Sequence, residues 1–192
     1  WIKLDSQGPV FFMQQRAGKQ ALPFKIYKFR TMLHRPPEAI NQHQEQVVSA
    51  GHDPRITRAG RFIRATSLDE LPQLINIFKG DMSVVGPRPV LIEQTEVVPP
   101  SYKKRFSVRP GLTGLAQVRG RRSLGWLQQL AYDAEYVDKY SLALDLKILL
   151  LTVKVVLTGG GIYGDPGLNW RTYRDRLNGQ PPQDSDVEEA MR

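Results

Sequence analysis

The chain of 192 residues contains no cysteine and only three histidines. The lack of cysteine excludes a disulfide framework, a thiol nucleophile and a cysteine-ligated metal site. His34, His43 and His52 form no pair at helical spacing, which indicates surface residues rather than metal ligands. The sequence also has no run of 18 uncharged apolar residues, so it offers no obvious membrane-spanning helix.

Basic residues outnumber acidic ones by 27 to 19, which gives the chain a net charge of +8. This excess favours an anionic partner such as a nucleotide diphosphate, an acidic lipid surface or a nucleic acid. A nucleic acid is not expected, because the basic residues are dispersed and no standard recognition motif occurs. We predict one folded domain over residues 1–178 and a polar, disordered tail over residues 179–192.

Local patterns predict an α+β fold that is mostly helical and contains one small β-hairpin. The hairpin is predicted from two strand-like segments, residues 10–16 and 24–29, which are separated by glycine and proline. Residues 109–120 contain proline and three glycines and predict a loop with at most one short strand. Helices are predicted over residues 36–50, 57–65, 67–79, 101–106, 124–139 and 142–157.

The last of these helices, over residues 142–157, is rich in leucine and valine but carries Asp145, Lys147 and Lys154. It is too short and too charged to span a bilayer. Two interpretations remain open: a nearly buried core helix, or a helix that lies in a membrane surface with its lysines at the headgroups.

The helix predicted over residues 67–79 carries two adjacent carboxylates, Asp69 and Glu70, in its first turn. Ser67 and Glu70 match a capping box, and Gly80 follows the helix as a C-terminal cap. Most such boxes only cap a helix. The positive end of a helix dipole nevertheless favours ionised carboxylates, so a catalytic role for the acidic pair is the alternative.

Arginines surround this acidic pair in the sequence. Arg64 lies five residues before Asp69, and Arg88 follows the helix between two prolines, which would hold its guanidinium in a fixed place. Arginine binds phosphate through two parallel hydrogen bonds. An ionised aspartate among arginines is suited to attack a phosphorus atom.

Five segments in this order agree with one known family. They are residues 8–18, 24–32, 64–89, 109–118 and 132–149, the third of which contains Asp69, Glu70 and the Pro-Arg-Pro sequence at Arg88. Over residues 1–157 the chain resembles the bacterial sugar transferases, the monotopic polyprenyl-phosphate phosphoglycosyl transferases. One departure is Arg119-Gly120-Arg121-Arg122, where family members commonly have Gly-Arg-Asn, so no role is assigned to this segment.

The resemblance implies transfer of a sugar 1-phosphate from a UDP-sugar to polyprenyl (undecaprenyl) phosphate, with release of UMP. Such a reaction initiates the synthesis of a bacterial glycoconjugate or exopolysaccharide. By the same resemblance Asp69 is the nucleophile and forms a covalent phosphosugar-aspartate intermediate. Glu70 helps to hold Mg²⁺, which prefers carboxylate and phosphate oxygens.

Further substrate-binding residues are expected around this pair. Arg88 and Arg64 are the candidates that grip phosphate. Lys28 and Arg30 lie on the same side of an alternating strand, so they either project into the site together or form a solvated face. The loop that begins at Arg109 and includes Gln117 resembles the family's loop near the nucleotide or the lipid headgroup.

The resemblance also implies a location. Family members begin with a hydrophobic helix that enters the membrane and returns to the same face, and Trp1 corresponds to a point after that helix. We therefore expect a catalytic portion without this helix, with amphipathic helices lying on the cytosolic face of the bacterial inner membrane. A homodimer is left open.

Two other functions are left open by the sequence. One is a Mg²⁺-dependent UDP-sugar hydrolase, which would release sugar phosphate to water. The other is an inactive membrane scaffold, although a scaffold has no need of the intact Asp69-Glu70 pair.

Overall fold

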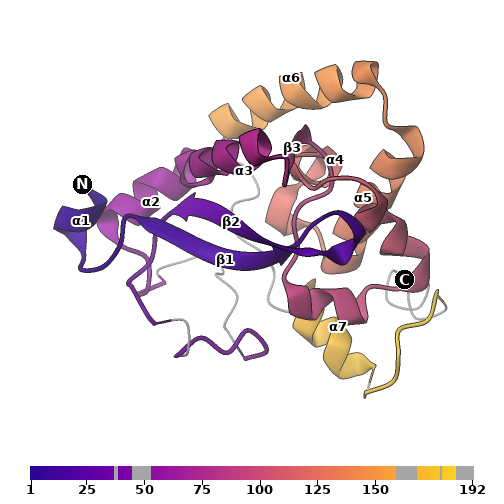
Figure 1. Cartoon of the computed structure of the whole chain (residues 1–192), viewed down its shortest axis with the longest axis horizontal. Helices are drawn as coiled ribbons and strands as arrows, with labels where there is room; N and C mark the ends of the chain where they lie inside the picture. Colours follow the sequence, from indigo (N-terminus) through magenta and orange to yellow (C-terminus); the bar gives the residue numbers. More distant parts are fainter. Residues whose placement is uncertain (37–38, 45–52, 159–167, 178, 185–192) are drawn as a thin grey trace.

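The computed structural model describes residues 1–36, 39–44, 53–158, 168–177 and 179–184. A β-hairpin crosses the middle of the molecule, with short helices along one edge and a longer helical part at one end (Figure 1). The α+β class predicted from the sequence is confirmed. Most of the helix predicted over residues 36–50 lies outside the described residues, and its described part, residues 36 and 39–44, contains no α-helix.

The predicted hairpin is confirmed within one residue at each strand. Strands β1 (Phe11–Ala17) and β2 (Pro23–Phe29) pair antiparallel, with Phe11 opposite Phe29 and Ala17 opposite Pro23. A 3₁₀ turn, η1 (Lys19–Ala21), joins them. The two strands place alternate side chains on opposite faces, and one face of β2 turns toward the site described below.

Helix α2 (Arg58–Ala65) also forms where the sequence predicts it. The Oγ1 atom of Thr57 accepts a hydrogen bond from the backbone N–H of Gly60 and caps the helix. Gly60 lies against the backbone after β2, and a Cβ atom there would be 1.9 Å from the carbonyl oxygen of Thr31. Only glycine allows this approach, which fixes α2 against the end of the hairpin.

The single helix predicted over residues 67–79 is wrong. The structure has a 3₁₀ helix, η3 (Leu68–Gln73), followed by a short α-helix, α3 (Leu74–Lys79). Ser67 adopts a left-handed conformation with φ 59° and makes no side-chain cap, so the predicted capping box does not form. Pro72 explains part of the difference, because it has no N–H to donate within an α-helix. Gly80 ends α3 in the left-handed conformation, as predicted.

A buried side chain ties α3 to the hairpin. Asn76 accepts a hydrogen bond from the backbone N–H of Tyr27 (3.1 Å) and donates one to the carbonyl of Lys25 (2.7 Å). Its neighbours Leu74, Ile75 and Phe78 are exposed. The apolar side of α3 therefore faces outward, while the polar residue Asn76 makes the inward contact and sets the distance between α3 and β2.

A small parallel sheet joins two loops, and one of its strands lies within residues 109–120, where the sequence predicted at most one short strand. Strand β3 (Ser83–Val85) pairs with β4 (Gly111–Thr113). The backbones touch at glycines: a Cβ on Gly111 would lie 2.1 Å from the Gly86 nitrogen, and one on Gly114 would lie 2.1 Å from the Gly86 oxygen. This contact fixes the start of the Arg88 loop (residues 86–91) against the segment that leads into helix α4 (Leu115–Arg119).

The remaining elements surround these loops. The helix predicted over residues 124–139 is confirmed as α5, and the one over residues 101–106 forms as a 3₁₀ helix, η5. Helices α1, α4 and α7 were not predicted. The bounds are α1 Ile2–Asp5, η4 Ile92–Val97, η5 Pro100–Ser107, α4 Leu115–Arg119, η6 Arg121–Ser123, α5 Trp126–Lys139, α6 Leu142–Thr158 and α7 Trp170–Arg176.

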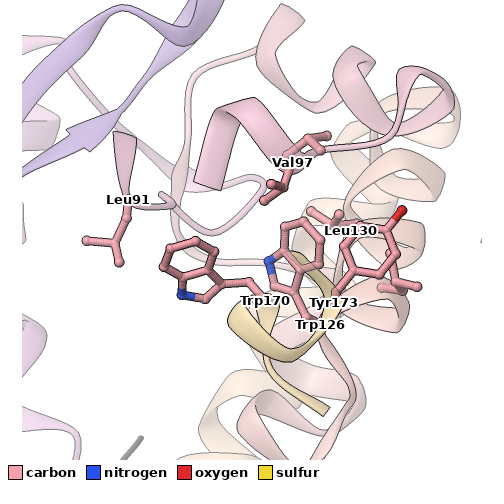
Figure 2. Packing of buried hydrophobic residues seen from close by; sticks show 8 residues of the cluster. Leu91, Val97, Trp126, Leu130, Trp170 and Tyr173 are labelled. Carbon is pink, nitrogen blue, oxygen red and sulfur yellow. The ribbon is translucent and has the colours of Figure 1, made fainter. Parts of the chain in front are cut away.

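The largest apolar core lies where η4, α5 and α7 meet. Figure 2 shows Trp126, Trp170 and Tyr173 packed together beside Leu91 and Leu130. The rings of Trp126 and Tyr173 have centroids 5.4 Å apart. This core holds α5 in place, and α5 supplies buried polar residues to the site.

Helix α6 lies at the edge of the molecule in Figure 1, and Ile148 is its one buried residue among the described side chains. Its residues Leu142, Leu146, Leu150, Val153 and Leu157 are exposed. The interpretation of α6 as a nearly buried core helix is therefore wrong. Among the described residues, no helix is long and apolar enough to cross a membrane.

Candidate active site

A cavity of about 680 Å³ lies between the hairpin, η3, the Arg88 loop and the core helices. Cavities of this size commonly hold small-molecule ligands. Its lining includes eight arginines and Lys28 but only two carboxylates, Asp69 and Asp133. A cavity with this excess of positive charge is suited to an anionic ligand, because its walls concentrate the electrostatic field.

Glu70 joins two cations at the wall of this cavity. Its Oε1 atom accepts hydrogen bonds from Lys28 Nζ at 2.8 Å and from Arg88 Nη2 at 2.7 Å. Burial would raise the pKa of Glu70, but Arg88 and Lys28 outweigh this effect and hold that pKa well below its ordinary value. Glu70 is therefore an ionised group that positions two cations from different parts of the chain.

Asp69 is adjacent in sequence but has a different environment. It lines the cavity, and no described residue forms a hydrogen bond with its carboxylate. Burial raises its pKa, while the charges of Lys28, Arg64 and Arg88 oppose that shift. One carboxylate of the pair is thus fixed by two cations, whereas the other is open to a ligand.

The Arg88 loop is held from both of its sides. Pro87 and Pro89 restrict its backbone, and the Arg88 carbonyl accepts a hydrogen bond from Arg105 Nη2 at 2.6 Å. The same Nη2 donates to Asp133 Oδ2 at 2.6 Å, and Nε donates to it at 3.1 Å. The side chains of Arg105 and Asp133 are only 2% exposed. The sequence did not assign either residue to the site.

The burial of Asp133 raises its pKa, although Arg105 opposes this effect. The pair connects α5 to η5 and to the Arg88 backbone. The Tyr132-Asp133 sequence within one of the family segments was a signal for Asp133, whereas nothing in the sequence marked Arg105.

Four of the predicted site residues come together at the acidic pair: Lys28, Asp69, Glu70 and Arg88. Arg64, at the end of α2, lines the same cavity. Arg30 also lines it, but its guanidinium donates to the carbonyls of Pro9 (2.6 Å) and Ser6 (2.8 Å) and so ties the N-terminal segment to the hairpin.

Two predicted residues lie outside the described lining of this cavity. Arg109 is exposed, and its carbonyl packs near Gly86. Gln117 is buried in α4, and neither of its side-chain polar atoms has a hydrogen-bond partner among the described residues. Its neighbour Ala116 is the residue of α4 that reaches the cavity.

Arg121 is a further cation that the sequence interpretation left without a role. Its φ of 54° is unusual for a residue other than glycine. Its Nη2 donates to Ser67 Oγ at 3.3 Å. Burial lowers the pKa of Arg121, with Glu70 opposing and Arg88 reinforcing that shift. Arg121, within the segment that departs from the family pattern, thus contacts the residue that precedes η3, the element that carries the acidic pair.

The acidic pair could hold a metal ion that needs only one or two carboxylate ligands from the protein. No group of three or more histidine, aspartate or glutamate side chains capable of holding a metal occurs in the described part of the chain. Mg²⁺ is commonly bound by one or two carboxylates together with substrate phosphates and water. Asp69 and the Oε2 atom of Glu70, which accepts no hydrogen bond from a described residue, suit such an ion.

The cation-lined cavity with one open carboxylate is suited to a phosphorylated ligand. A family model described as bacterial sugar transferase matches residues 1–159. The chain therefore belongs to the bacterial sugar transferase family, which confirms the resemblance inferred from the sequence.

Individual relatives of the chain are also described as transferases of sugars or sugar phosphates. The chain is 44% identical to EpsL of Bacillus subtilis, described as an uncharacterized sugar transferase, over 84% of this chain and 76% of EpsL. It is 45% identical to the UDP-glucose:undecaprenyl-phosphate glucose-1-phosphate transferase of Caulobacter vibrioides, over 84% of this chain and 62% of that protein. It is 40% identical to the undecaprenyl-phosphate galactose phosphotransferase of Salmonella typhimurium, over 85% of this chain and 37% of that protein. The chain thus spans less than two thirds of two of these three relatives.

Proposed function

We propose that this chain transfers a sugar 1-phosphate from a UDP-sugar to undecaprenyl phosphate and releases UMP. The observation that carries the proposal is the contrast within the acidic pair. Asp69 is open to the cavity, while Glu70 holds Lys28 and Arg88 beside it. The family and the printed names of the relatives support the substrate classes.

The first step would be attack by an Asp69 carboxylate oxygen on the phosphorus that bears the sugar. A bond forms between that oxygen and phosphorus, and the bond to the bridging oxygen breaks, so that UMP leaves. Lys28 and Arg88 lie where they can stabilise the negative charge on the phosphoryl oxygens. Arg64, which also lines the cavity, would bind the second phosphate.

The second step would transfer the same phosphoryl group to the lipid. A phosphate oxygen of undecaprenyl phosphate attacks the phosphorus, and the bond to Asp69 breaks. The products are a lipid-linked diphosphosugar and the regenerated carboxylate. A covalent intermediate divides one displacement into two and lets UMP leave before the lipid arrives.

Mg²⁺ would be held by Glu70, together with Asp69 and the diphosphate oxygens. When bound, the ion supplies positive charge that neutralises the diphosphate and the leaving UMP. The identity of the donor sugar stays open, because relatives of similar identity are named for glucose, for galactose and for N-acetylgalactosamine.

We also propose that the molecule rests on the cytosolic face of the bacterial inner membrane. Helices α1, α2, α3 and α6 lie along one edge of the molecule in Figure 1. Their exposed apolar side chains include Leu4, Phe62, Leu74, Ile75, Phe78, Leu142, Leu146, Leu149, Leu150, Val153 and Leu157. Exposed apolar surface of this extent is typical of a membrane or protein contact.

The test is product analysis with undecaprenyl phosphate, Mg²⁺ and labelled UDP-sugars. Wild-type protein should form a lipid-linked sugar and UMP, and Asp69→Asn should form neither. Asp138→Asn is the matched control, because it makes the same change at an exposed position on α5. Release of free sugar phosphate without lipid product would instead indicate a hydrolase. Full activity in Asp69→Asn would refute the assignment of the nucleophile.

A further inference from the structure

A second cavity, of about 240 Å³, lies between α4, α5 and α6. The described residues that line it are different from those that line the active-site cavity. Its apolar part consists of Leu115, Leu144, Ile148 and Leu151. Its charged part consists of Arg119, Glu135, Lys139 and Lys147.

The charged side chains leave this cavity with excess positive charge. Glu135 accepts a hydrogen bond from Lys139 Nζ at 2.9 Å, so this carboxylate offsets one of the three cations. The guanidinium of Arg119 lies over the ring of Tyr132, with its Cζ 6.0 Å from the ring centroid. Such a contact holds an arginine side chain along the protein surface. An apolar cavity with a cationic rim matches an amphiphile that carries a negative charge.

Helix α6 extends this pattern beyond the cavity. Its exposed residues Leu142, Leu146, Leu150, Val153 and Leu157 recur at intervals of three or four and form one stripe. Lys147 and Lys154 are seven residues apart, so both lie on the same flank of the stripe. Lys147 also lines the cavity, which therefore opens beside the leucine stripe.

We propose that this cavity binds the phosphate headgroup of an anionic phospholipid, whose acyl chains lie along the exposed stripe of α6. The proposal rests on the proposed membrane contact and adds a defined lipid site to it. The positive rim is complementary to a phosphodiester. The lipid would not be the acceptor substrate, because Asp69 lines the other cavity. It would anchor α6 and fix the orientation of the enzyme on the bilayer.

The experiment is vesicle co-sedimentation of the full chain with phosphatidylcholine vesicles, with and without phosphatidylglycerol. The double variant Arg119→Gln/Lys147→Gln removes two charges from the cavity. The control Lys19→Gln/Lys154→Gln removes two charges outside it, one of them on the same flank of α6. Each charge near an anionic surface strengthens binding about fivefold. The cavity variant should therefore lose about 25-fold in binding to phosphatidylglycerol vesicles, and the control about fivefold or less.

A gain of binding provides a second test that misfolding cannot imitate. Glu135→Gln removes the carboxylate that offsets one positive charge of the cavity, so binding to phosphatidylglycerol vesicles should strengthen about fivefold. Glu96→Gln makes the same change at an exposed position of η4 and should leave binding unchanged. Equal effects for the cavity variants and their controls would overturn the proposed site.

The wild-type protein separates this proposal from the proposed function. Equal binding to both kinds of vesicle would overturn the headgroup site and leave the membrane contact in place. No binding to either kind of vesicle would overturn both the headgroup site and the membrane contact. Lipid-linked product formed in detergent would still support the proposed transferase activity. Tighter binding to vesicles that carry undecaprenyl phosphate instead of phosphatidylglycerol, lost in the cavity variant, would contradict the choice of lipid.

Discussion

Replacing Glu70 with glutamine tests the role that the structure gives to the second carboxylate of the acidic pair. The change keeps the shape of the side chain but removes the negative charge between Lys28 and Arg88. The side chains of Glu70, Lys28 and Arg88 are 20%, 15% and 34% exposed, so all three are partly shielded from water. Two cations would then approach the same oxygen without a compensating charge.

The expected cost follows from these contacts. Removing one partner of a buried ion pair costs about 3–5 kcal/mol, and a hydrogen bond to a charged group contributes about 1.5–3 kcal/mol. Because the three side chains keep some access to water, we expect a loss of about 2–3 kcal/mol in the free energy of unfolding. Misplaced cations should also lower turnover about 100-fold.

Urea unfolding and steady-state sugar transfer measure the two effects on the same protein. Glu96→Gln is the control for the loss of one exposed carboxylate. Asp69→Asn provides the contrast: burial raises the pKa of Asp69, which means that the fold disfavours its charged form. That variant should lose turnover while its stability stays equal or rises. If Glu70→Gln unfolds within about 0.5 kcal/mol of wild type and keeps normal turnover, the positioning role is refuted.

Three further predictions concern the surroundings of the site. Asp133→Asn should destabilise the protein by about 3–5 kcal/mol in urea unfolding, because it leaves the buried Arg105 without the carboxylate that it contacts, whereas no described residue is hydrogen-bonded to Asp69. It should also raise the KM for the donor, and an unchanged KM would contradict the link between Asp133 and Arg88. Ile148→Ala should lower the free energy of unfolding by about 2–5 kcal/mol, because its side chain is buried. Leu150→Ala, on the exposed side of α6, should change it by less than about 0.5 kcal/mol, and equal losses would contradict this orientation of α6. Because the folded state lowers the pKa of Glu70, its stabilisation should be fully present above about pH 4.5 and be lost as the pH falls through the folded-state pKa. The stability difference between wild type and Glu70→Gln should therefore shrink in acid, and a difference that grows there would contradict the sign of the shift.

The sequence predicted those elements whose patterns are local. Alternating branched and aromatic residues beside glycine and proline marked the hairpin, and apolar spacing marked α5. The prediction failed over residues 67–79. Pro72 has no N–H to donate within an α-helix, and Glu70 accepts hydrogen bonds from Lys28 and Arg88 instead of completing the capping box. It also missed β3 and its pairing with β4, because that pairing joins residues far apart in the sequence, Ser83 and Gly111, and depends on close contacts between glycine backbones.

The residues of the site also differ in whether local sequence patterns can predict them. Asp69, Glu70 and Arg88 lie within one continuous segment, so their association could be inferred from order along the chain. The ion pair between Arg105 and Asp133 joins residues 28 positions apart, and no local pattern indicates it. Lys28 and Arg30, which the sequence places on the same side of a strand, also have different partners. Lys28 contacts Glu70, whereas the guanidinium of Arg30 binds the N-terminal segment.

Intact-protein mass spectrometry tests the central claim most directly. The protein would be incubated with Mg²⁺ and a panel of UDP-sugars in the absence of undecaprenyl phosphate. The account predicts a mass increase of one sugar phosphate with the correct donor, its absence in Asp69→Asn, and its disappearance when undecaprenyl phosphate is added. Formation of lipid-linked sugar by the same protein without any adduct, or an adduct that persists in Asp69→Asn, would contradict it.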